Sequence, residues 1–217
     1  MRPAADLSLY LVTDRELCLG RSVESVVMES IRGGVSCVQL REKFLTTRAF
    51  IDSARALKKR LSLLGIPLVV NDRVDVALAA EADGVHLGQG DMPYLAARRL
   101  LGPEAVIGLS VESIDQAREA DEWDVDYLGV SPVFATPTKT DTHAPWGLDG
   151  LRRLRELSRH RLIAIGGVDP SNAAGILEAG ADGLAVVSAI CSAADPEGAA
   201  RRLRGIVDRH RSERTRG

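Results

Sequence analysis

Cysteine is scarce in this sequence, and its arrangement excludes two classes of protein. The three cysteines, Cys18, Cys37 and Cys191, lie far apart and form no CxxC pair. An odd and scattered set is not the pattern of a disulfide framework or of a structural zinc site. We therefore expect reduced thiols and a cytoplasmic location.

Long apolar runs are also missing. No run approaches the roughly 18–20 residues that a bilayer-spanning helix needs. The N-terminal stretch MRPAADLSLYLVTD reaches the charged Asp14 too early for a signal peptide, and its apolar part is typical of a first strand. The sequence therefore favours a protein without a membrane partner.

The chain has no large excess of charge of either sign. It has 28 basic and 30 acidic side chains, and its formal net charge is −2. Nucleic-acid binding needs a concentrated basic surface, which this balance does not supply. The last stretch, RRLRGIVDRHRSERTRG, is locally basic, and we interpret it as a solvated helix face followed by a short basic tail at about 211–217. We expect small-molecule substrates as partners rather than nucleic acid, and the sequence leaves homo-oligomerisation open.

The sequence does contain many short apolar runs, each ending in polar or glycine residues. With 217 residues, 45% of them hydrophobic, the chain is long enough to bury a sizeable core. Runs this short, rich in Val, Ile and Leu and without alternation, suit strands that are buried on both faces. The runs lie at 7–14, 36–41, 67–72, 83–88, 105–111, 127–133, 162–168 and 183–189.

Amphipathic segments lie between these runs, so predicted strands and helices alternate. The segment 22–34, for example, places Val23, Val26 and Val27 on one side of a helix. This alternation predicts a parallel sheet, and its eight repeats predict a closed (β/α)8 TIM barrel that forms a single domain over residues 1–217. A doubly wound open sheet is the alternative fold. No GxGxxG follows the first predicted strand, which disfavours the dinucleotide-binding form of that alternative.

A barrel brings the carboxyl ends of all its strands to one mouth, so residues far apart in the sequence become neighbours there. The second predicted strand ends in QLREK, and alternation sends Gln39, Arg41 and Lys43 to one side. Arginine presents a planar fork that suits phosphate oxygens, and lysine adds a compact charge. The alternative interpretation is an exposed strand end with ordinary surface charges.

Amide and acidic side chains follow the third and fourth predicted strands. Asn71 and Asp72 end the third strand, and Asp91 lies in the GQGDMP loop after the fourth. Two carboxylates beside cations and an amide indicate a hard divalent ion, because Mg²⁺ is typically bound by one or two carboxylates together with phosphates and waters. Helix capping is the alternative, since both aspartates precede helical segments.

His86 and Ser110 lie in the fourth and fifth predicted strands. A lone histidine among apolar neighbours, as in GVHLG, is more typical of a core residue or of a residue that supports a site than of a ligand. Ser110 has a hydroxyl that suits a phosphate or a substrate heteroatom, but a serine at that place also suits an N-cap or a filling role.

The seventh and eighth predicted strands end in GGV and VVSA, where Gly166, Gly167, Val187 and Ser188 stand. The loops after these two strands frequently hold a phosphate in (β/α)8 barrels. Glycines let backbone N–H groups approach the anion, and a helix N-terminus favours it. A tight turn that requires glycine is the alternative.

The loop after the sixth predicted strand, SPVFATPTKTDTHAPWG, has no apolar period of 2 or 3.6. Thr136, Thr138 and Lys139 bring hydroxyl donors and a cation to a mouth that already gathers anion-binding groups. Pro137 limits how far the loop moves. An ordinary surface loop is the alternative.

Together these motifs resemble the thiamine-phosphate synthase family, also called the thiamine-phosphate pyrophosphorylases. The match covers about residues 8–190 in order, through LYLVTD, VQLREK, VVNDRVDVALAAEADGVHLGQGDMP, IGLSV, YLGVSPVFATPTKTD, IAIGGV and AVVSAI. The resemblance implies a (β/α)8 barrel that joins hydroxymethylpyrimidine diphosphate to a thiazole phosphate, or to its carboxylated tautomer, in thiamine biosynthesis. It also implies release of pyrophosphate and a requirement for Mg²⁺.

Carried over position by position, the resemblance implies a role for each motif residue. The pyrimidine diphosphate, or the departing pyrophosphate, would be held by Gln39, Arg41, Lys43, Asn71, Ser110 and Lys139. The Mg²⁺ ligands would be Asp72 and Asp91. The thiazole phosphate would be seated by Thr136, Pro137, Thr138, Gly167, Val187 and Ser188. The catalytic groups would be Arg41, Lys43, Ser110 and Lys139.

No nucleophilic triad or catalytic cysteine is recognisable in the sequence, and the implied chemistry needs neither, because the thiazole nitrogen serves as the nucleophile. The resemblance implies a dissociative route in which the C–O bond breaks first and gives a pyrimidinylmethyl cation. The protein would then stabilise the leaving pyrophosphate with Mg²⁺ and with its cationic side chains. Two other functions are alternatives. One is a thiazole tautomerase of the same barrel type, which would not need the cationic and metal end, and the other is a non-catalytic barrel that binds a phosphate ligand.

Overall fold

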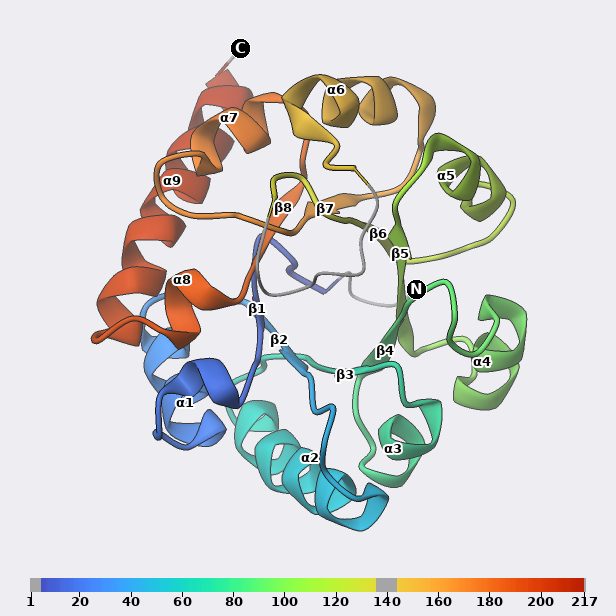
Figure 1. Cartoon of the computed structure of the whole chain (residues 1–217), viewed down its shortest axis with the longest axis vertical. Coiled ribbons are helices and arrows are strands. Elements are labelled where there is room, and N and C mark those ends of the chain that lie inside the picture. Colours follow the sequence, from blue (N-terminus) through green and yellow to red (C-terminus); the bar gives the residue numbers. More distant parts are fainter. Residues whose placement is uncertain (1–4, 136–143, 217) are drawn as a thin grey trace.

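The computed structural model describes residues 5–135 and 144–216, and these form a closed barrel of eight parallel strands (Figure 1). Each strand pairs with its successor in the sequence, and β8 closes the barrel by pairing with β1. This closure confirms the predicted (β/α)8 barrel and excludes the doubly wound open sheet. The strands are β1 Leu9–Val12, β2 Cys37–Leu40, β3 Leu68–Asn71, β4 Gly84–Leu87, β5 Val106–Val111, β6 Tyr127–Val130, β7 Leu162–Ala164 and β8 Gly183–Val186.

Helices surround the strands as an outer ring (Figure 1). Three of them begin at a residue whose side chain accepts a hydrogen bond from the first turn, namely Ser22, Thr46 and Ser113. The bounds are η1 Glu16–Cys18, α1 Val23–Arg32, α2 Thr47–Ser62, α3 Val74–Ala79, α4 Tyr94–Leu101, α5 Ile114–Ala120, α6 Gly147–Leu157, α7 Ala173–Glu178, α8 Ser188–Cys191 and α9 Pro196–Arg216.

The apolar core has two layers, and strand alternation decides which residue enters which layer. On β1, Leu9 and Leu11 belong to the layer between strands and helices, with Val26 and Val27 of α1. The alternate residues of the strand, Tyr10 and Val12, point into the barrel and join a smaller inner cluster. That cluster comprises Leu7, Tyr10, Val12, Cys37, Val69, Tyr127, Ile163 and Ala185.

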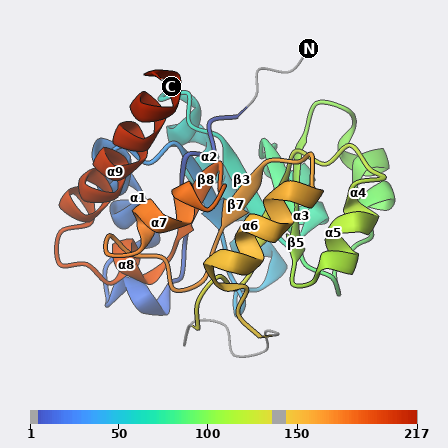
Figure 2. The same cartoon turned by 90° about the horizontal axis from the view of Figure 1, so that it is seen from above.

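Helix α9 packs along the outside of the barrel against α1 and α7 (Figure 2). Its Arg211 donates a hydrogen bond to the carboxylate of Asp6, just before β1, at 3.2 Å. The carboxyl-terminal part of α9 therefore lies at the amino end of the strands, away from the barrel mouth. The basic segment expected as a tail at about 211–217 continues α9 as far as Arg216.

The expectation of reduced thiols is met within the described ranges. The cysteines Cys18, Cys37 and Cys191 are all buried and none forms a disulfide. Among residues 5–135 and 144–216, no helix is both long enough and apolar enough to cross a membrane.

Candidate active site

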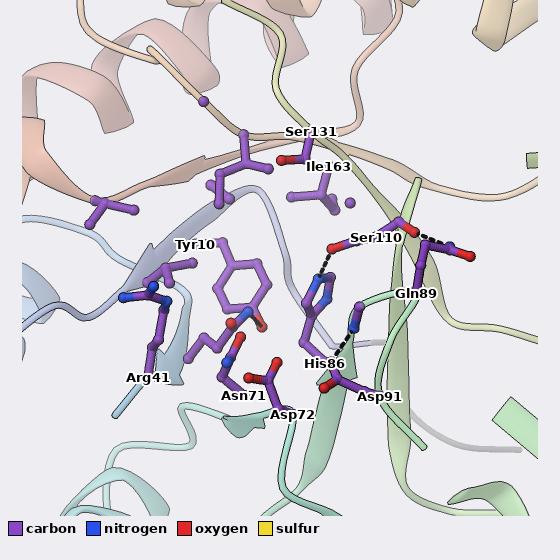
Figure 3. Close-up of a pocket in the computed structure, with 18 of the residues that line it drawn as sticks. Tyr10, Arg41, Asn71, Asp72, His86, Gln89, Asp91, Ser110, Ser131 and Ile163 are labelled. Atoms are coloured by element: carbon purple, nitrogen blue, oxygen red, sulfur yellow. Dashed lines mark hydrogen bonds between the residues drawn. The ribbon is translucent and has the colours of Figure 1, made fainter. Parts of the chain in front are cut away.

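A cavity of about 430 Å³ opens at the carboxyl ends of the strands (Figure 3). Polar side chains from β2, β3, β4 and β5 face one another across it, as the barrel prediction required. The lining residues predicted from the sequence are Gln39, Arg41, Lys43, Asn71, Asp72, Asp91, Ser110 and Val187. Other lining residues are Tyr10, Val12, His86, Gly88, Gln89, Gly90, Glu112, Tyr127, Gly129, Ser131, Ile163, Ile165, Gly166 and Ala185.

The two cations that follow β2 are each held by a carboxylate. Arg41 Nη1 lies 3.0 Å from Asp14 Oδ2, and the side chain of Arg41 is 25% exposed. Lys43 Nζ lies 2.6 Å from Asp72 Oδ2. The intervening Glu42 pairs with Arg15 instead, so the alternation predicted for QLREK is correct. Because Arg41 and Lys43 both line the cavity, they form part of a cationic wall rather than a set of unrelated surface charges.

The carboxylates of Asp72 and Asp91 lie close together on the same side of the cavity (Figure 3). Asp91 Oδ2 accepts a hydrogen bond from the backbone N–H of Gly88 at 2.7 Å. Burial raises the pKa of Asp91 above its ordinary value, and the neighbouring Asp72 carboxylate raises it further. This pair is therefore a compact site of negative charge that favours a cation.

Neither aspartate acts as the N-cap residue that the sequence allowed. The N-cap of α3 is Arg73, and that of α4 is Pro93. Asp72 instead has a left-handed backbone, with a φ of 61°, and its N–H donates to His86 O at 2.8 Å. A residue other than glycine with positive φ is uncommon, and such residues cluster at functional sites.

The donor set of this pair fits Mg²⁺. Within the described part of the chain, no group of three or more His, Cys, Asp or Glu side chains could enclose a metal ion. A dedicated protein cage, of the kind that binds zinc or calcium, therefore has no counterpart among these residues. Two adjacent carboxylates at a cavity wall do match Mg²⁺, which usually keeps several waters and takes its remaining ligands from substrate phosphates.

His86 and Ser110 are joined by a hydrogen bond. His86 Nε2 lies 2.9 Å from Ser110 Oγ, and His86 Nδ1 lies 2.9 Å from Tyr127 OH. His86 therefore contacts both Ser110 and Tyr127, and it lines the cavity. The N-cap of α5 is Ser113, so Ser110 is not a helix cap.

The ends of β7 and β8 carry the residues that the sequence analysis named there. Gly166 and Gly167 have φ values of 97° and 65°, which glycine adopts readily. A Cβ on Gly166 would lie 2.7 Å from Pro132 Cβ, and one on Gly167 would lie 2.8 Å from Phe134 Cβ. The turn therefore requires glycine at both positions, because the segment after β6 packs directly on them. Gly166 and Val187 line the cavity, whereas Gly167 and Ser188 lie outside the set of residues that line it.

The loop residues Thr136, Pro137, Thr138 and Lys139 lie outside the described residues. The segments on either side of them are described and are bonded to each other. Trp146 N donates to Pro132 O, and Gly147 N donates to Val133 O, each at 2.9 Å. Phe134 N donates to Gly166 O at 3.1 Å. Both flanks of the loop are therefore fixed beside the end of β7, at the mouth.

The site residues that the sequence analysis missed include apolar and aromatic side chains on strands, namely Tyr10 and Val12 of β1, Tyr127 of β6, Ile163 of β7 and Ala185 of β8. Alternation along each predicted strand would have identified them, because every second residue faces the barrel interior. The candidate residues were chosen for their polar chemistry, and the apolar side chains of the cavity wall do not have it.

Comparisons with known proteins assign this chain to a family. A family model described as thiamine monophosphate synthase matches residues 9–190. The chain belongs to this family. The matched range begins at the first residue of β1 and ends within α8, so the thiamine monophosphate synthase match includes all eight strands of the barrel.

Relatives of the thiamine monophosphate synthase family are similar to this chain along most of their length. The thiamine-phosphate synthase of Albidiferax ferrireducens is 59% identical over 202 residues, which are 93% of this chain and 92% of the relative. That of Syntrophomonas wolfei is 52% identical over 206 residues, which are 95% of this chain and 99% of the relative. The solved structure of thiamine phosphate pyrophosphorylase from Pyrococcus furiosus is 38% identical, has a TM-score of 0.87, and matches over 95% of this chain and 98% of that one.

Proposed function

We propose that this chain is a thiamine-phosphate synthase, which joins hydroxymethylpyrimidine diphosphate to a thiazole phosphate and releases pyrophosphate. The observation that carries the proposal is the single cavity in which Arg41 and Lys43 face the carboxylates of Asp72 and Asp91. A substrate that carries a diphosphate, and that reacts by losing it, needs such a combination of cations and metal ligands. Relatives that are 46–59% identical carry the same name.

The cationic and amide residues are assigned to the pyrimidine diphosphate. Arg41 and Lys43 would contact the diphosphate oxygens, and their carboxylate partners keep both side chains oriented before the substrate arrives. The remaining residues assigned to this substrate, on their agreement with the family motifs, are Gln39, Asn71, Ser110 and Lys139.

Asp72 and Asp91 are assigned to Mg²⁺. When bound there, the ion supplies positive charge to the leaving pyrophosphate. Lys43 already bonds Asp72 Oδ2, so this lysine stands beside both the carboxylates and the expected position of the diphosphate. The two carboxylates therefore hold the metal and also orient a cation of the site.

The thiazole phosphate is assigned to the opposite side of the mouth, where β6, β7 and β8 end. The positive φ values of Gly166 and Gly167 support this assignment, because glycine allows the backbone to approach an anion closely. The flanks of the loop after β6 are bonded to the same place. The residues assigned to this phosphate are Thr136, Pro137, Thr138, Gly167, Val187 and Ser188.

In the proposed mechanism, the bond to pyrophosphate breaks before the bond to the thiazole forms. The C–O bond to pyrophosphate breaks first, and the electron-rich aminopyrimidine stabilises the methylene cation that forms. Arg41, Lys43, Ser110 and Lys139 stabilise the developing negative charge on the leaving group, and the thiazole nitrogen then attacks the methylene carbon. Removal of one such group should lower kcat on the order of 10²–10³-fold, by analogy with oxyanion donors.

The deciding experiment mixes both substrates with Mg²⁺ and detects thiamine phosphate through its oxidised fluorescent derivative. Product should form, should stop when EDTA is added, and should return with excess Mg²⁺. Arg41→Ala should lower kcat strongly. Arg152→Ala should not, because Arg152 pairs with Asp149 on the surface of α6. Absence of product from the wild-type protein would favour the tautomerase or the non-catalytic barrel, and metal-independent turnover would contradict the assignment of Asp72 and Asp91.

A further inference from the structure

A continuous chain of side-chain hydrogen bonds crosses the interior of the barrel. Gln39 Nε2 donates to Tyr10 OH at 3.1 Å, and Tyr10 OH lies 3.0 Å from Tyr127 OH. Tyr127 OH lies 2.9 Å from His86 Nδ1, and His86 Nε2 lies 2.9 Å from Ser110 Oγ. Five strands contribute one residue each, so the chain runs from Gln39 on β2 to Ser110 on β5. Figure 3 shows its members Tyr10, His86 and Ser110.

One set of directions gives every bond in the chain a donor and an acceptor. In this set Tyr10 OH accepts from Gln39 and donates to Tyr127, and Tyr127 OH donates to His86 Nδ1. Because Nδ1 is an acceptor, neutral His86 carries its proton on Nε2 and donates it to Ser110 Oγ. The hydroxyl proton of Ser110 is thereby directed away from His86, toward the cavity.

The rings in this chain are held tightly. Tyr127 stacks on His86 with ring centroids 5.5 Å apart, and it meets Tyr10 edge to face at 5.8 Å. Glycines on the neighbouring strands leave just enough room for the rings. A Cβ on Gly108 would lie 2.0 Å from Tyr127 Cζ, and one on Gly129 would lie 2.8 Å from His86 Cε1. Rings packed in this way are held in place, so the packing fixes where the bonded oxygen and nitrogen atoms lie.

The chain transmits orientation rather than protons. Burial raises the pKa of Tyr10 and of Tyr127 well above the ordinary value, so both phenols stay neutral. The chain ends in the amide of Gln39, which neither gains nor loses a proton near neutral pH. A proton that left through Ser110 would therefore have no source at the other end.

We propose that His86, Tyr127 and Tyr10 are positioning residues. They hold Ser110 as a hydrogen-bond donor to the diphosphate, and they bind the amide nitrogen of Gln39 so that its oxygen is the atom that meets the pyrimidine. The roles given to Gln39 and Ser110 rest on the proposed function. The four bonds and the packing of the rings do not depend on that function. A hydrogen-bond donor that already points to the place where negative charge develops does not have to reorient during the reaction.

The first test measures the tautomer of His86 directly and needs no activity. In ¹⁵N NMR of histidine-labelled protein, with the His86 signals assigned by their loss in His86→Gln, Nε2 should carry the proton and Nδ1 should be bare. Tyr127→Phe removes the donor to Nδ1 and should weaken this preference. A wild-type His86 that is protonated at Nδ1, or at both nitrogens at neutral pH, overturns the proposal whether or not the protein is a synthase.

The second test uses kinetics with a matched control. Tyr127→Phe should lower kcat/KM for the pyrimidine diphosphate by about tenfold, the value of one hydrogen bond, and should leave the KM of the thiazole phosphate unchanged. Tyr94→Phe removes a buried phenol of similar kind, bonded to Asp124 O at 2.6 Å outside the cavity, and should leave both parameters unchanged. Equal kinetics for Tyr127→Phe and wild type overturn the proposal.

A conservative replacement separates positioning from packing. The amide nitrogen of Gln reaches about the position of His86 Nε2 and keeps a donor toward Ser110, whereas Met fills a similar volume without one. His86→Gln should therefore retain several-fold more turnover than His86→Met when both variants have the same Tm. The reverse order, or equal turnover, assigns His86 to packing alone and overturns the proposal. An inactive wild-type protein would contradict the proposed function, while the tautomer measurement would still decide the orientation of the chain.

Discussion

Lys43 Nζ lies 2.6 Å from Asp72 Oδ2, and this contact joins the cation that follows β2 to the carboxylate that follows β3. Asp72 is also next to Asp91 and has a φ of 61°. One aspartate therefore orients a lysine, contributes to the negative site and requires an uncommon backbone conformation.

Replacement of the Asp72 carboxylate should raise the Mg²⁺ concentration that the reaction needs, with little effect on folding. We expect Asp72→Asn to raise the Mg²⁺ concentration for half-maximal activity by at least about tenfold and to lower kcat on the order of 10²-fold. Asp75→Asn is the matched control, because Asp75 is an exposed carboxylate nearby that pairs with Arg73 instead. Magnesium titrations of initial rate check both variants. A half-maximal Mg²⁺ concentration that is the same for Asp72→Asn and wild type would rule out Asp72 as a ligand.

Glycine at position 72 should separate activity from stability. Asp72→Gly removes the carboxylate but relieves the positive φ, and this relief offsets the greater flexibility that glycine gives the unfolded chain. The free energy of unfolding should therefore stay within about 1 kcal/mol of wild type while turnover falls as in Asp72→Asn. Urea unfolding monitored by circular dichroism measures the first quantity. A loss of several kcal/mol would indicate that the Lys43 contact, rather than the backbone, governs stability there.

The two interior tyrosines predict how stability depends on alkaline pH. Burial raises the pKa of Tyr10 and Tyr127 in the folded state, whereas tyrosine in the unfolded chain ionises near pH 10. Below about pH 10 their contribution to stability is fully present, and above it the unfolded state loses protons that the folded state keeps. The free energy of unfolding should fall by about 1.4 kcal/mol per pH unit for each of them until its folded pKa is reached.

A Tyr94→Phe background isolates this effect, because Tyr10 and Tyr127 are then the tyrosines that remain of the three in the sequence. Phenolate absorbance should appear only together with unfolding, and the pH slope should become shallower when Tyr127→Phe is added. Phenolate absorbance from a fully folded protein near pH 10 would show that the interior is open to solvent.

The close packing of Tyr127 against Gly108 of β5 predicts that one added methyl group lowers the stability of the protein. A Cβ on Gly108 would lie 2.0 Å from Tyr127 Cζ, so Gly108→Ala has to displace the ring or the strand. We expect a loss of at least about 1–3 kcal/mol in the free energy of unfolding. Gly205→Ala is the control, since Gly205 lies within α9 and its added Cβ would make only an ordinary contact with Arg209, 3.6 Å away. That variant should gain about 0.5–1 kcal/mol from helix propensity, and urea unfolding compares the two.

Thiol reactivity should depend on access rather than on ionisation. The hydrogen bond from Cys191 lowers the pKa of Cys18, which by itself would favour reaction, whereas burial raises the pKa of Cys37. All three side chains are fully buried, so an aromatic disulfide reagent should react with none of them in the native protein and with all three in denaturant. A native-state reaction much faster than global unfolding would reveal local opening around η1 or α8.

Much of the barrel and part of its site could be predicted from the sequence because the relevant signals are local. Eight short apolar runs predicted the eight strands, although β7 covers only Leu162–Ala164 of the run at 162–168. Alternation within QLREK correctly placed Gln39, Arg41 and Lys43 together, since successive side chains on a strand point to opposite faces. At the ends of β7 and β8 the cavity is lined by Gly166 and Val187, and the roles assigned to the adjacent Gly167 and Ser188 stay predictions.

The sequence by itself determined the alternation of strands and helices, and with it the mouth at which polar strand ends gather. Only the tertiary structure decided which side chains meet across that mouth. Barrel closure and register set the distances from Tyr10 to Tyr127 and from His86 to Ser110, and these residues are separated by 117 and 24 positions in the chain. Local patterns carry no information about such separations, whereas a closed sheet fixes them through its hydrogen-bonded neighbours.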